Sequence, residues 1–249
     1  MKALVPAARS EPIKSIYLDQ FVYSEWAKAG LRGETPASLR LMVDHVSAGR
    51  IFCPLSLAHA CELARWHNIP ARDAAIELML KLSEGLVMAH IVDVCAGHRP
   101  VTWAPFLVPV VSVSQLTVES LDGLSPHEKL RAVFESLAKE VERPADEYIE
   151  NMLASMNAFS DQQRSPGEAS TPEAAWVLDV CRRRAADPGR GARGGDPFDI
   201  LHTCYAGLTD YGVVDRTHAA TVKGSQYVPG QIFSRVDDVL HALQADLKA

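Results

Sequence analysis

The stretch GGDPFDILHTCYAGLTDYGVVD, residues 194–215, combines a glycine pair, a helix pattern and a strand pattern. The helix is expected to begin at Asp196 and to carry a second acid, Asp199, in its first turn. After a short turn, the apolar run 211–214 predicts a buried strand that ends at Asp215. Ligands of open α/β sheets gather outside the carboxyl ends of parallel strands. These acids therefore predict a site at such an edge.

Two more acids follow this pattern near the start of the chain. The apolar run 15–18 predicts a short strand that ends at Asp19. Farther along, a helix is expected over 57–67, directly after another short strand. This helix places His59 and Glu62 three residues apart, on one face.

The complete pattern of apolar runs and breakers predicts the α/β fold class. Strands are expected over 15–19, 50–54, 86–94, 211–214 and within 226–233. Helices are expected over 21–28, 36–48, 57–67, 70–84, 172–186, 196–206, 217–223 and 236–247. Strands that alternate with helices indicate a three-layer α/β/α architecture with a central, mostly parallel sheet. We expect one domain over 1–249.

The middle of the chain is expected to be a helical insertion over roughly 100–186. Within it, helices are predicted over 125–142 and 144–159. Three prolines make 97–113 an expected irregular segment, because proline cannot donate a hydrogen bond to a strand ladder.

The composition is typical of a globular protein, with 249 residues, 47% of them hydrophobic and 22% charged. A formal net charge of -6 does not indicate tight, non-specific binding of nucleic acid. The five cysteines are scattered and form no Cys-x-x-Cys pair, which predicts free thiols in a reducing cytoplasm. The chain has no apolar run of about 18 residues, so we expect no membrane association. These cysteines are Cys53, Cys61, Cys95, Cys181 and Cys204.

Carboxylates that converge at one sheet edge repel one another unless a divalent cation neutralises them. Mg²⁺ and Mn²⁺ are the expected cations, because both accept carboxylate and water oxygens. Such an ion can activate a water molecule and stabilise the charge that builds on a phosphodiester. The sequence therefore predicts metal-dependent phosphodiester hydrolysis. The candidate metal ligands and catalytic residues are Asp19, Glu62, Asp196, Asp199 and Asp215.

The pattern resembles the PIN-domain nucleases, a family of small α/β proteins that includes the toxin ribonucleases of toxin–antitoxin pairs. The resemblance is carried by 16–19, 56–62, 196–202 and 210–215. It implies a PIN-like fold and an Mg²⁺ or Mn²⁺ site built from Asp19, Glu62, Asp196 or Asp199, and Asp215. Gln20 departs from the family, in which many members have a small or polar residue at this place.

Each acid also has a purely structural interpretation. Asp19 and Asp215 could be helix caps, because carboxylates are stabilised by the free N–H groups at a helix start. Asp196 and Asp199 fit the same description, with a proline between them at the first helical position. Glu62 could pair with Arg65 on the helix surface. Capping alone predicts no particular order of these acids along the chain.

Cations and histidines near the acids are candidates for contact with substrate. Arg190 and Arg193 lie in a glycine-rich loop before the late helix, and such a strip suits the phosphate backbone of RNA. His202 and Thr217 follow the acids closely, and His59 and His218 are further candidates. A buried structural histidine and a helix-capping threonine are the alternatives.

The function predicted first is a metal-dependent endoribonuclease, as a toxin or as a nuclease of defence or RNA processing. An antitoxin or another protein is an expected partner beside the RNA substrate. The alternative is a non-catalytic PIN-like module that binds RNA or protein. A haloacid-dehalogenase-like phosphatase is disfavoured because Phe21 stands where its second aspartate would be. No phosphate-binding glycine fingerprint is present.

Overall fold

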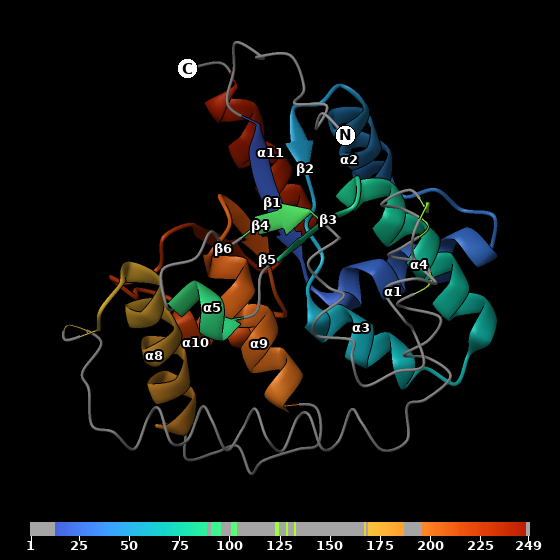
Figure 1. The fold of residues 1–249 in the computed structure, drawn as a ribbon. Helices are drawn as coiled ribbons and strands as arrows, with labels where there is room; N and C mark the ends of the chain where they lie inside the picture. Colours follow the sequence, from blue (N-terminus) through green and yellow to red (C-terminus); the bar gives the residue numbers. More distant parts are fainter. Residues whose placement is uncertain are drawn as a thin grey trace.

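The computed structural model describes residues 13–88, 91–95, 101–103, 123–124, 128, 132, 167, 169–186 and 196–247. A parallel sheet of four strands runs through its centre, in the order β2-β1-β5-β6 (Figure 1). The strands are β1 (Lys14–Leu18), β2 (Ile51–Phe52), β5 (Tyr211–Val213) and β6 (Gln231–Phe233). The predicted α/β class and the parallel sheet are confirmed.

Four helices cover one face of this sheet. They are α1 (Gln20–Leu31), α2 (Ala37–Ser47), α4 (Ile69–Ser83) and α11 (Val236–Asp246). Ile16 and Leu18 of β1 and Val213 of β5 point into this layer and share one apolar core with its helices. Apolar residues at every second strand position favour this arrangement, because successive side chains of a strand point to opposite faces.

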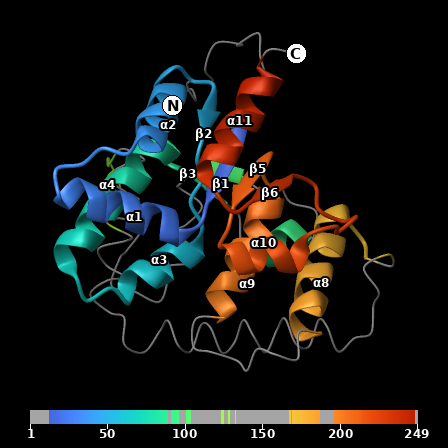
Figure 2. The same ribbon diagram turned by 180° about the vertical axis from the view of Figure 1, so that it is seen from behind.

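Three helices, α8 (Pro172–Ala185), α9 (Asp196–Gly207) and α10 (Arg216–Val222), pack on the opposite face (Figure 2). Tyr17 of β1 and Val214 belong to this second core. Gly212 of β5 lets α9 lie directly on the sheet. A Cβ atom at Gly212 would come within 2.5 Å of the Cβ of Ala206. Helices therefore flank the sheet on both faces.

The expected strand over 86–94 is wrong in its second half. β3 (Leu86–Met88) is a strand, but Ile91–Cys95 forms the helical turn α5. A short apolar run does not distinguish a buried strand from a buried helical turn. The segment expected to be irregular, 97–113, contains the strand β4 (Val101–Trp103), which pairs antiparallel with β3. Pro100 and Pro105 flank this strand rather than interrupt it.

The sheet order has a switch point between β1 and β5. After β1 the chain adds β2 on one side, and it later adds β5 and β6 on the other side. The strand order thus reverses at β1, and ligands of open α/β sheets bind outside the carboxyl ends of the strands at such a point. The helix α3 (Leu57–Ala64), which follows β2, lies at this edge.

Of the predicted insertion, β4 and α8 are well described, whereas the helices expected over 125–142 and 144–159 lie largely outside the described residues. All five cysteines are free thiols. Within the described part of the chain, no helix has the length and apolar character that would let it span a bilayer.

Candidate metal centre

Four of the five predicted acids lie together at the carboxyl edge of the sheet. Asp19 directly follows β1, and Asp215 comes two residues after the end of β5. Glu62 lies on α3, and Asp199 lies in the first turn of α9. With two histidines they form a first group, Asp19–Glu62–His202, and a second group, Asp199–Asp215–His218. Within each group, the possible ligand atoms all lie within 4.8 Å of one another.

Asp19 is a buried carboxylate, with 5% of the residue exposed. Asp19 stands at the N-cap position of α1, although its side chain makes no capping hydrogen bond to the helix. Burial raises the pKa of Asp19, and the neighbouring carboxylates of Glu62 and Asp215 raise it further against the opposing charge of His202. The surroundings of Asp19 thus disfavour its charged form.

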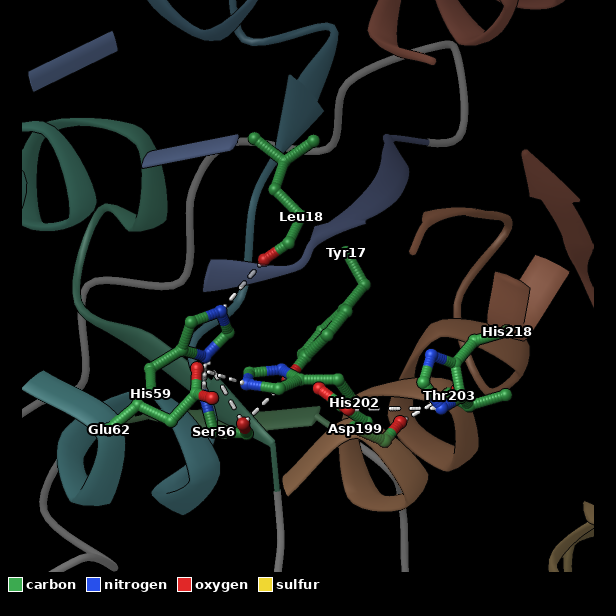
Figure 3. Close-up of polar contacts among 9 residues, drawn as sticks. All are labelled: Tyr17, Leu18, Ser56, His59, Glu62, Asp199, His202, Thr203 and His218. Atoms are coloured by element: carbon green, nitrogen blue, oxygen red, sulfur yellow. Dashed lines mark hydrogen bonds and ion pairs between the residues drawn. The ribbon is translucent and has the colours of Figure 1, made fainter. Parts of the chain in front are cut away.

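Glu62 of α3 pairs with His202 of α9. The Nε2 atom of His202 lies 3.1 Å from Oε2 of Glu62 (Figure 3). Burial opposes a charge on the imidazole, but Asp19 and Glu62 outweigh it and raise the pKa of His202 to about 9. This contact joins α3 to α9 at the edge of the sheet.

Asp215 acts both as a helix cap and as a member of the acidic site. Its Oδ1 accepts hydrogen bonds from the backbone N–H groups of Thr217, at 2.6 Å, and His218, at 3.2 Å. Its Oδ2 contacts Nδ1 of His218. Burial opposes the charge of Asp215, yet the bonds from His218 hold its pKa well below the ordinary value. The cap predicted as an alternative is therefore present, beside the predicted carboxylate cluster.

Asp199 connects the two groups electrostatically. Its Oδ2 lies 3.9 Å from Nε2 of His218. Burial is the largest cause that raises the pKa of Asp199 to about 6, and the carboxylates of Asp19, Glu62 and Asp215 add to it against His218. The four acids therefore behave as one cluster rather than as two isolated groups.

A chain of buried hydrogen bonds extends from this cluster into the protein. The hydroxyl of Tyr17 lies 2.7 Å from Nδ1 of His202 and 2.7 Å from Oγ of Ser56. Oγ of Ser56 lies 3.1 Å from Nδ1 of His59. At the far end, Nε2 of His59 donates to the carbonyl oxygen of Leu18 at 2.7 Å (Figure 3). One side chain from β1 thus reaches both α3 and α9.

His59 is a structural histidine rather than a substrate contact. It is completely buried, and it forms a capping box with Ser56 at the start of α3. Burial and the nearby His202 hold the pKa of His59 well below its ordinary value. His202 is also completely buried, which places it inside the cluster and not on a surface that faces substrate.

Of the other predicted site residues, one lies at the margin of this network and three have no described side chain. Asp196 begins α9, but its side chain is not among the described ones, and Arg190 and Arg193 lie outside the described residues. Thr217 is exposed beside Asp215, and the cap of α10 is Asp215 rather than Thr217.

Two features of the centre were missed by the sequence reasoning. The role of Tyr17 was not predicted, although a tyrosine within a buried strand needs a partner for its hydroxyl. The pairing of Glu62 with His202 was also missed, and a pairing with Arg65 was considered instead. A signal did exist for His202, because it follows Asp199 by three residues and so lies on the same face of the helix.

The donor set fits a divalent cation. Carboxylate oxygens suit Mg²⁺ and Mn²⁺, and imidazole nitrogen suits the transition ions. Burial and the carboxylates of Glu62 and Asp215 disfavour the charged form of Asp19 and so raise its pKa. A bound cation would stabilise that charged form. The predicted convergence of Asp19, Glu62, Asp199 and Asp215 is therefore present in the geometry.

Comparison with known proteins gives no assignment of this chain. No protein-family model, no curated protein and no solved structure matches it.

Proposed function

We propose that this protein is a metal-dependent endoribonuclease with a PIN-like fold. The observation that carries the proposal is the convergence of four carboxylates from four separate elements at the switch point of the sheet. Helix capping explains one of them, Asp215, but gives no reason for Asp19 or Glu62 to lie beside it.

The resemblance to PIN-domain nucleases supports the same conclusion. It implies an acid at the end of the first strand, one on an early helix, one at the start of a late helix and one after the late strand. The structure has Asp19, Glu62, Asp199 and Asp215 at these places. Of the two late candidates, only Asp199 has a described side chain, and its Oδ2 lies 3.9 Å from Nε2 of His218, which also contacts Asp215.

In this proposal Asp19, Glu62, Asp199 and Asp215 hold Mg²⁺ or Mn²⁺. The bound ion would supply an activated water and would stabilise charge on the phosphodiester. Asp19 provides a desolvated carboxylate, and His218 keeps Asp215 ionised through its contact with Oδ2. The burial of these groups strengthens their electrostatic effect, because the local dielectric is low.

Cationic residues beside the cluster favour a polyanionic substrate such as RNA. Arg216 is exposed directly after Asp215, and Arg182–Arg184 form the last turn of α8, which packs on α10. Arg183 is bonded to Asp179 at 2.7 Å, so part of this charge also stabilises the helix. Arg183 also lies 3.5 Å from the carbonyl oxygen of Lys223, at the opposite end of α10 from Asp215. Arg216 is therefore the cation beside the cluster, and it can attract RNA backbone phosphates, which are bound mainly by lysine and arginine.

The test is cleavage of mixed cellular RNA by the purified full chain with Mn²⁺, with Mg²⁺ and with a chelator. We expect cutting only with metal, and loss of cutting in Asp19→Asn. His241→Gln is the matched control, because His241 is exposed on α11. RNA binding without cutting in either metal would replace this proposal with the non-catalytic module, whose partner is RNA or protein.

A further inference from the structure

We infer that His202 is itself a metal ligand through Nε2, and that Tyr17, Ser56 and His59 are positioning residues that hold its ring for this purpose. The inference rests on the proposed function and adds to it the preference of the centre for Mn²⁺ over Mg²⁺. Neither the carboxylate pattern nor the resemblance assigns a histidine to the ion.

The hydrogen-bond chain is anchored at its far end by the backbone. The carbonyl oxygen of Leu18 only accepts, so Nε2 of His59 must carry a hydrogen and donate it. The backbone N–H of Ser56 points at Nδ1 of His59 at 3.0 Å, so Nδ1 must be an acceptor. These two contacts determine which nitrogen of His59 carries its hydrogen without reference to the acidic cluster.

The two hydroxyls between His59 and His202 can point in either direction along the chain. In one direction His202 Nδ1–H donates to Tyr17, Tyr17 donates to Ser56, and Ser56 donates to Nδ1 of His59. Every hydroxyl hydrogen has an acceptor in this direction, as it also does in the reverse one. In the reverse direction Tyr17 donates to Nδ1 of His202, and Nε2 must carry the hydrogen that contacts Glu62.

In the first direction Nδ1 carries the hydrogen that is donated to Tyr17, so an ion that displaces the proton shared between Nε2 and Glu62 would find the electron pair of Nε2 facing the acidic cluster. Nε2 lies 3.1 Å from Oε2 of Glu62, in the group that also contains Asp19. A histidine that binds a metal usually donates its other ring N–H to a fixed partner, which sets the tautomer and the ring orientation. Tyr17 is such a partner, and Figure 3 shows its hydroxyl directed at the ring of His202.

Imidazole changes which ion the centre prefers. Carboxylates and water suit Mg²⁺ and Mn²⁺ alike. Mg²⁺ is a hard ion that binds oxygen ligands, whereas first-row transition ions accept imidazole nitrogen more readily, and Mn²⁺ is the weakest binder among them. Removal of a purely structural histidine would weaken both ions equally. Removal of a ligating histidine should weaken Mn²⁺ more than Mg²⁺. The ratio of the two affinities therefore separates the two roles.

The experiment measures the binding of Mn²⁺ alone and of Mg²⁺ alone to the full chain by calorimetry. In His202→Gln we expect Mn²⁺ affinity to fall at least tenfold while Mg²⁺ affinity changes by less than about threefold. In Tyr17→Phe, which keeps the ring, we expect a loss of Mn²⁺ affinity of about tenfold, the lower end of the range for partners of metal ligands. His241→Gln should change neither affinity. Equal losses for both ions in His202→Gln, or no loss, would overturn the inference.

A spectroscopic measurement keeps the test decisive if His202→Gln fails to fold. Electron spin-echo modulation of bound Mn²⁺ should show coupling to a directly bonded nitrogen in the natural protein. The coupling should persist in His218→Gln, which removes the other imidazole of the cluster. Absence of coupling in the natural protein, or its complete loss in His218→Gln, would contradict ligation by His202.

Different results would contradict the proposed function and the ligand role of His202. If the natural protein binds neither ion and cuts no RNA, the proposed function fails, and the ligand role of His202 fails with it. If the protein cuts RNA with metal and His202→Gln binds Mn²⁺ as tightly as before, only the inference about His202 fails.

Discussion

Both ends of the paired strands β1 and β5 carry aspartates, but the surroundings shift the pKa of these aspartates in opposite directions. At the amino ends, Asp210 accepts hydrogen bonds from the backbone N–H and the hydroxyl of Ser15, both at 2.8 Å. Lys14 adds an ion pair at 3.2 Å. Although burial opposes it, these donors lower the pKa of Asp210. This carboxylate is satisfied entirely by the chain.

At the carboxyl ends, Asp19 is more deeply buried and lies among further carboxylates. Its pKa is raised, chiefly by burial, where that of Asp210 is lowered. The difference teaches how to distinguish a structural acid from a functional one on the same pair of strands. Hydrogen-bond donors and cations of the chain stabilise the charge of a structural acid. Acids at a functional site more often have perturbed pKa values, because the chain alone does not stabilise their charge.

The largest effect that we expect is on catalysis, from Asp19→Asn. Loss of one metal-binding carboxylate should remove several kcal/mol of transition-state stabilisation, which is about a 10³-fold drop in RNA cleavage. The variant should unfold in urea, with chelator present, at a midpoint no lower than that of the natural protein, because a desolvated charge has been removed. Cleavage at the natural rate would show that Asp19 is not part of the catalytic centre.

The next effect is stabilisation by metal. A ligand at 100 times its Kd stabilises the folded state by about 2.7 kcal/mol. We expect Mn²⁺ to raise the Tm of the natural protein and of Asp210→Asn by a similar amount, and to leave the Tm of Asp19→Asn nearly unchanged. Equal stabilisation of Asp19→Asn in a thermal scan would place the ion elsewhere.

A smaller effect should follow from Asp210→Asn. The amide loses the ion pair with Lys14 and weakens the bonds to Ser15. Because the side chain is 36% exposed, we expect a loss of only about 1 kcal/mol in the free energy of unfolding. Cleavage by the folded variant at saturating Mn²⁺ should not change. If the variant instead lost cleavage but not stability, the comparison between the two ends would be wrong.

The smallest effect is the pH dependence of stability without metal. The pKa of Asp199 is raised to about 6, so the folded protein takes up a proton at a higher pH than the unfolded chain does. Between about pH 6 and pH 4, the ordinary range of an unfolded aspartate, this group makes the protein more stable as the pH falls. The lowered pKa of buried His59 has the opposite effect below about pH 6.5, so the test is the difference between two proteins. In urea unfolding with chelator, the stability of the natural protein should rise more, or fall less, toward low pH than that of Asp199→Asn. If the free energy of unfolding depended on pH identically in both proteins, Asp199 would not be coupled to the other acids.

The sequence was sufficient to predict the elements that carry the acids. Short apolar runs ending in Asp19 and Asp215 predicted the strands, and the structure has β1 and β5 there. Their convergence with Glu62 followed from the rule that parallel strands present their carboxyl ends at one edge. The interpretation of 86–94 as one strand failed, because an apolar run fits a buried strand and a buried turn equally well.

The interior of the centre was harder to predict, because it depends on contacts between distant elements. Asp196 and Asp199 are three residues apart on one helix face, so spacing alone could not choose between them. The bond between Tyr17 and His202 joins residues 185 positions apart, and no local pattern indicates it. Such contacts depend on how α9 packs on the sheet, and Gly212 of β5 allows α9 to approach the sheet closely.

The pairing of β1 with β5 also governs when the centre can exist during synthesis. Ser15 and Asp210 are 195 positions apart in the chain, yet they are bonded in the folded protein. At 5–20 residues per second, a ribosome needs roughly 10 to 40 s to make the residues between them. Asp19 therefore emerges long before Asp199 and Asp215 can join it. Until residues 199 and 215 have been made, a nascent chain lacks half of the acidic cluster. Under the proposed function, such an unfinished copy lacks the centre that would cut the messenger RNA to which it is attached.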